Sequence, residues 1–151
     1  MMGKISIIFL LMMMLTGCEE KTSYSYLVAH PAALKKAGAR CDALTQPTPD
    51  EITQCKLVMS IVIQFDGLMR EQQSDPERFG QRILETQINY ADAEIASQRA
   101  QQQLATLRAE GAPEVTVQAA ATQVEKAEKR YWQLQDEVAL LMTVAAINTP
   151  G

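Results

Sequence analysis

Apolar residues near the C-terminus recur at alternating spacings of three and four residues, the pattern of a coiled-coil seam. The seam positions are Val117, Ala120, Val124, Ala127, Tyr131, Leu134, Val138, Leu141 and Ala145. This spacing predicts one amphipathic helix from about 113 to 146, with the seam facing a partner helix. Self-association through residues 117–145 is one way to cover the seam. Trp132 lies next to it, and we interpret Tyr131 and Trp132 as packing residues rather than a binding site.

A second long helix is predicted over 76–110. Ser74-Asp75-Pro76-Glu77 is a helix start signal, and the next clear break is Gly-Ala-Pro at 111–113. Its apolar stripe is Leu84, Ile88, Ala91 and Ile95, after which glutamines intervene and Leu104 and Leu107 resume on a shifted face. The short break favours antiparallel neighbours. We therefore expect a long antiparallel helical hairpin, coiled-coil-like, over 74–147, with a tail at 148–151.

A third helix is predicted from about 49 to 73. Thr48 and Glu51 have the spacing of a capping box, with Pro49 between them at the first helical position. Apolar residues crowd 57–65 and charged residues bracket them, so we expect the most buried helix rather than a membrane span. A short buried strand over 57–63 is the alternative, because periodicity alone does not separate the two.

The region before this helix is predicted to be a tether over 18–29 that ends by docking, then a short helix starting at His30-Pro31. With the third helix it forms a helical base over 30–73. The fold class is therefore all-α. His30 is interpreted as a surface or capping residue.

The chain offers few groups for catalysis or metal binding. It has one histidine and no Gly-rich phosphate loop, and its carboxylates are spread along predicted helix faces. The formal charge is −4, and it becomes −5 if Lys4 is removed with residues 1–17. That charge disfavours direct nucleic-acid binding. We expect no enzymatic activity, no metal and no cofactor.

The first residues have the pattern of an export signal. Lys4 precedes an apolar run over 5–14, which is too short for a membrane span of about 20 residues. The run ends in Leu15-Thr16-Gly17-Cys18, which resembles the lipobox of bacterial lipoproteins. The resemblance implies a signal peptide over 1–17, cleavage before Cys18, and acyl chains on Cys18 that bind the lipid bilayer. A chance cysteine after a transmembrane-like start is the alternative.

Cys41 and Cys55 form an even pair once Cys18 is lipidated. In an oxidising envelope such a pair predicts a disulfide, which would tie the helical base together. Two buried free thiols and half of a metal site are the competing interpretations. The metal site lacks ligands, because structural zinc needs four Cys or His groups.

These features together resemble a known family over residues 1–55. After the lipobox come Tyr26-Leu27, His30-Pro31 and the paired cysteines, as in the EexN-like entry-exclusion lipoproteins of conjugative plasmids. The resemblance implies an envelope protein facing the periplasm that blocks redundant DNA entry by contacting a protein of the mating apparatus. The lipobox resemblance also implies sorting by the residue after Cys18, where Glu19 in place of Asp favours the outer membrane over the inner one. The alternatives are a lipoprotein subunit of a type IV secretion or conjugation channel, and an unrelated coiled-coil scaffold.

Overall fold

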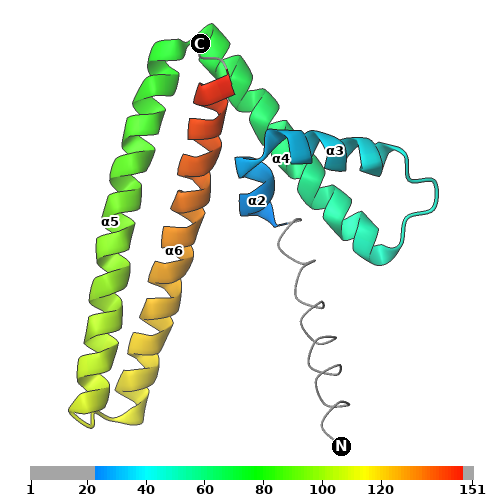
Figure 1. Cartoon of the computed structure of the whole chain (residues 1–151). Coiled ribbons are helices and arrows are strands. Elements are labelled where there is room, and N and C mark those ends of the chain that lie inside the picture. Colours follow the sequence, from blue (N-terminus) through cyan, green and yellow to red (C-terminus); the bar gives the residue numbers. More distant parts are fainter. Residues whose placement is uncertain (1–22, 148–151) are drawn as a thin grey trace, which may run out of the picture. The chain divides into compact units, whose positions relative to one another are not determined.

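The computed structural model describes residues 23–147, and it holds five α-helices in that range (Figure 1). They are α2 (Tyr24–Ala29), α3 (Pro31–Asp42), α4 (Pro49–Ser74), α5 (Pro76–Ala109) and α6 (Glu114–Ile147). These residues contain no strand, so the all-α prediction is confirmed and the strand over 57–63 is wrong. The chain divides into two compact units, the first ending at Val62 and the second beginning at Ile63.

Helix α2 lies inside the segment predicted to be a tether over 18–29, and that prediction is wrong for its second half. The hydroxyl of Ser23 accepts a hydrogen bond from the backbone N–H of Tyr26 at 3.2 Å, which caps the helix start. Leu27 and Val28 are almost fully buried. The expected docking is confirmed, and burial of these two side chains holds a helix of only six residues.

Helix α3 begins at Pro31, as predicted, because proline suits the first helical position. It continues through Gly38 to Asp42 and buries Leu34. The predicted start of α4 is also confirmed. The backbone N–H of Thr48 donates to a carboxylate oxygen of Glu51 at 2.9 Å, and the N–H of Glu51 donates to the Thr48 hydroxyl at 3.3 Å.

Helix α4 buries a single stripe, so the deep burial predicted for it is found on one face only. The buried positions follow the three-and-four spacing of one helix face: Val58, Ile61, Phe65 and Leu68. The opposite face is also apolar, yet Ile52, Met59 and Ile63 remain exposed. Apolar residues therefore occupy two faces of α4. The apolar residues beyond the buried stripe, which led to the prediction of deep burial, lie at the surface.

Helices α5 and α6 lie side by side and are joined by a tight turn (Figure 1). Asp75 caps α5 by accepting from the N–H of Arg78 at 3.0 Å. Gly111 follows the helix at a φ of 67°, in the left-handed region that glycine adopts without strain. Both helices begin and end within a few residues of the positions predicted from sequence.

The seam of α6 is confirmed, because each of its nine predicted positions is buried or half-buried. The apolar stripe predicted for α5 lies at the surface. Leu84, Ile88 and Ile95 are 61%, 62% and 46% exposed. The buried α5 positions are smaller or lie elsewhere on the helix: Phe79, Thr86, Ala93 and Ser97. Small side chains on this face let α6 approach closely, whereas the larger aliphatic side chains lie outside the contact.

Candidate functional site

The predicted lipidation site lies outside the described residues. Leu15, Thr16, Gly17 and Cys18 precede Ser23, where the description begins. Signal cleavage and acylation therefore stay predictions.

The four residues of the family-like motif form one corner between α2 and α3. The rings of Tyr26 and His30 stack with centroids 4.1 Å apart, and His30 Nδ1 donates to the Tyr26 carbonyl oxygen at 2.8 Å. Leu27 is 2% exposed, and Pro31 starts the next helix. His30 therefore satisfies a carbonyl at the end of α2, which agrees with the interpretation of a surface or capping residue. The motif therefore builds a helix corner, and its contacts serve local structure.

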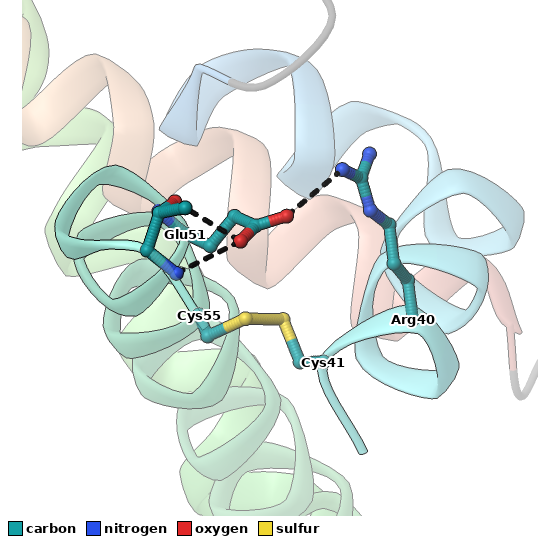
Figure 2. A network of polar contacts seen from close by, with 5 residues as sticks. Arg40, Cys41, Glu51 and Cys55 are labelled. Carbon is teal, nitrogen blue, oxygen red and sulfur yellow. Dashed lines mark hydrogen bonds and ion pairs between the residues drawn. A yellow bond between two sulfur atoms is a disulfide. The ribbon is translucent and has the colours of Figure 1, made fainter. Parts of the chain in front are cut away.

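The predicted disulfide is confirmed. Cys41, in the last turn of α3, is bonded to Cys55 in α4 with a Cα–Cα distance of 5.6 Å (Figure 2). Both thiols are therefore used in a covalent link. The alternatives of two free thiols and half of a metal site are wrong for this pair.

A carboxylate beside the disulfide is held by Thr48, just before α4, and by Arg40 of α3. One Glu51 oxygen accepts from the N–H and the hydroxyl of Thr48, and the other lies 3.6 Å from the Arg40 guanidinium (Figure 2). The hydrogen bonds from Thr48 lower the pKa of Glu51, and Arg40 adds to the effect. The capping box was predicted from sequence. The Arg40 contact was missed, because it depends on how α3 and α4 pack together.

An open groove of about 300 Å³ is lined in part by the two disulfide cysteines. Its lining is mainly apolar and includes Leu44, Pro47, Ile52 and Met59, with Lys56 at one side. The groove has no cluster of acids, bases or nucleophiles, so its chemistry is that of apolar contact.

Tyr90 and Tyr131 meet in the seam of the second unit. Their hydroxyl oxygens are 3.0 Å apart and the rings stack with centroids 5.2 Å apart. Trp132 contacts Tyr131 edge-on, at 4.9 Å between centroids, but is 57% exposed. Tyr131 is half-buried in the seam, as expected of a packing residue, and Trp132 lies next to the seam as predicted, where its ring packs against Tyr131 but stays largely exposed.

An exposed apolar surface runs along α5. We call Leu84, Ile88, Ala91 and Ile95 the α5 stripe; all four are exposed and share one helix face, since they step by four, three and four residues. They are the apolar stripe that the sequence predicts for this helix. Single exposed aliphatic residues are ordinary, whereas a row of them indicates an interaction surface.

Among residues 23–147, α4 is the helix that is long and apolar enough to cross a membrane. This result rests on length and composition alone, and Asp66 and Arg70 lie on the helix. No known protein family, curated protein or solved structure matches the chain.

Proposed function

We propose that the chain is a lipid-anchored envelope lipoprotein that acts in conjugative entry exclusion, without enzymatic activity, by binding a protein of the mating apparatus. The observation that carries this proposal is the order of features over 15–55: a lipobox-like sequence, the Tyr26-Leu27 and His30-Pro31 motif, and the cysteine pair. The motif forms a helix corner and the two cysteines are bonded. Both features support a small folded domain directly after the anchor, like that of the lipoproteins that the sequence resembles.

The anchor has a clear physical basis. Each buried methylene of an acyl chain contributes about 0.8 kcal/mol, and two or three chains on one residue give stable membrane attachment. Only Glu19 to Thr22 separate Cys18 from Ser23, where the helical region begins. Lipid on Cys18 would therefore keep the first unit next to the bilayer surface, facing the periplasm, with the outer membrane as the proposed membrane.

The second unit supplies a surface for recognition. We infer that α5 and α6 form an antiparallel hairpin, because Gln87 contacts Met142, Tyr90 contacts Tyr131 and Gln101 contacts Glu128. The sequence separation of these pairs falls from 55 to 27 toward the turn. Each helix has 34 residues and is about 50 Å long at 1.5 Å per residue. Its exposed faces over 76–147 are the proposed recognition surface.

Self-association through residues 117–145 stays a prediction. Those seam positions are buried or half-buried within the chain, so self-association through them requires α5 and α6 to separate first.

Lipidation is tested first. Cells that express the chain are labelled with radioactive palmitate, and the Cys18→Ser variant is compared with the wild type. We expect labelling of the wild type and none of the variant. A Cys41→Ser/Cys55→Ser variant is the control, because it removes two other thiols and should keep the label. Label that persists on Cys18→Ser overturns the anchor.

Exclusion is tested in matings. Recipients that express the chain should receive less DNA from an equivalent donor than recipients with an empty vector, and deletion of 76–147 with the lipobox kept should abolish the difference. Unchanged exclusion after that deletion places recognition elsewhere.

Matings also distinguish the alternative functions, because loss of the protein changes DNA transfer differently for each of them. A structural subunit of a secretion or conjugation channel is needed by the donor, so its loss abolishes transfer out of the cell. Loss of an exclusion factor instead raises transfer in. An unrelated coiled-coil scaffold changes neither rate.

A further inference from the structure

We infer that the α5 stripe is the docking site for an amphipathic helix whose apolar face is bordered by lysine or arginine. The inference deepens the proposed function: it rests on 76–147 as the recognition surface and states the chemistry of the partner. Its evidence lies in the exposure of the stripe and the charges beside it.

The stripe is an apolar face that the chain itself leaves uncovered. Leu84 and Ile88 are each more than 60% exposed and Ile95 is 46% exposed, while the α5 residues packed toward α6 are largely small. The stripe extends over 84–95, or about 17 Å of helix at 1.5 Å per residue. That length matches about three turns of a partner helix, whose apolar residues at three-and-four spacing would pack along it.

Carboxylates border the stripe on both sides. Glu85 and Asp92 lie on one side of the stripe around the helix, and Glu94 lies on the other side; all three are exposed. We call these three residues the acidic border. Arg99 lies about one turn beyond Ile95, at the end of the stripe. A partner with cations beside its apolar face would complement the border, and such complementarity speeds association and favours the correct partner.

The same charges disfavour a second copy of the chain as the partner that covers the stripe. In a parallel pairing through the stripe, Glu94 of one copy faces the side of the other that carries Glu85 and Asp92. In an antiparallel pairing, Glu85 of one copy approaches Asp92 of the other. Carboxylates meet carboxylates in both arrangements, which is unfavourable. Anionic lipid head groups would also be repelled by the acidic border.

Binding is measured with the full chain in phosphatidylcholine nanodiscs and a fluorescent helical peptide of about 18 residues, long enough to cover the stripe. The peptide carries leucines at three-and-four spacing with lysines on both sides. A second peptide replaces these lysines with glutamates. We expect the basic peptide to bind, the acidic peptide not to bind, and the affinity of the basic peptide to fall as salt is raised.

Three variants locate the site. Leu84→Gln/Ile88→Gln/Ile95→Gln should weaken binding by about tenfold or more, which is the change that 1.4 kcal/mol produces. Glu85→Gln/Asp92→Asn/Glu94→Gln should weaken it less and reduce its salt dependence. Val115→Gln/Ile147→Gln is the matched control: it replaces exposed aliphatic residues outside the stripe, and binding should be unchanged. Circular dichroism verifies that each variant keeps its helix content.

The inference is overturned by equal binding of the acidic peptide, by unchanged binding of the basic peptide to the stripe variant, or by self-association of the chain that the stripe variant removes. Binding to phosphatidylglycerol vesicles in place of the basic peptide overturns it as well. Failure of the proposed function can be told apart from failure of the docking site. If the wild type gives no exclusion in matings but the basic peptide binds through the stripe, the docking site stands and the exclusion role does not.

Discussion

The hydroxyl oxygens of Tyr90 and Tyr131 lie 3.0 Å apart, so one phenol donates a hydrogen bond to the other between α5 and α6. This hydrogen bond is the largest cause of the raised pKa of Tyr90, because the bond is made by the neutral phenol. Partial burial raises the pKa further, and the negative charge of Glu94 acts in the same direction. The pair therefore links the packing of the two long helices to pH.

The first prediction concerns the alkaline stability of this pair. The folded-state pKa of Tyr90 is raised, so its contribution to stability is complete below its ordinary pKa of 10.0 and is lost as the pH rises through the folded value. Tyr131→Phe removes the partner hydroxyl and should move the pKa of Tyr90 back toward 10.0. Titration of tyrosinate absorbance measures the shift. Tyr26→Phe is the control: it keeps Tyr90 and Tyr131, so the tyrosinate absorbance should still show the step at high pH that belongs to Tyr90. If Tyr131→Phe also keeps this step, the hydrogen bond to Tyr131 is not the cause of the raised pKa.

The second prediction separates the buried seam from the α5 stripe. Leu134 is 2% exposed, so Leu134→Ala should reduce the free energy of unfolding by about 2–5 kcal/mol, as large-to-small changes in cores do. Leu84 is 61% exposed, and Leu84→Ala should change it by less than about 0.5 kcal/mol. Urea unfolding followed by circular dichroism measures both. A larger loss from Leu84→Ala than from Leu134→Ala would falsify the assignment of the helix contact.

The helix starts were predictable because they depend on local chemistry. Thr48 and Glu51 cap α4 within one turn, and Asp75 caps α5 in the same way. The α6 seam was also predictable, because one helix face holds its large apolar residues. Helix α2 was not predictable in this way, because its six residues are too few to show a helical period.

The contact face of α5 was not predictable from its own pattern. The stripe at Leu84 has the larger apolar residues and the correct spacing, yet the face that packs contains Thr86, Ala93 and Ser97. Which face packs depends on the shape of α6, whose large side chains fit against small ones. The contact of Arg40 with Glu51 joins two helices, so it depends on how α3 and α4 pack together and not on the pattern of either helix alone.

The third prediction concerns acid stability at Glu51. Hydrogen bonds from Thr48 lower the folded-state pKa of Glu51 below its ordinary value of 4.5. Its contribution to stability is therefore present above pH 4.5 and is lost as the pH falls through the lower folded value. Glu51→Gln should reduce the acid dependence of the melting temperature in that window. Asp50→Asn is the control, as Asp50 also lies in the first turn of α4 but lacks the capping-box spacing; an equal effect of both variants contradicts a specific role for Glu51.

The fourth prediction uses the disulfide to separate the two units. Cys41 and Cys55 lie 14 residues apart, and removal of a crosslink closing a loop of that size costs about 3 kcal/mol by loop entropy. Both residues belong to the unit that ends at Val62, whereas Trp132, the single tryptophan of the chain, lies in the other. Cys41→Ser/Cys55→Ser should therefore lower the unfolding midpoint of part of the helical signal in circular dichroism, and the Trp132 fluorescence transition should stay in place. Reduction of the wild type should reproduce this split, and adding reductant to the double variant should change nothing. If both signals shift together by the same amount, the two units unfold as one.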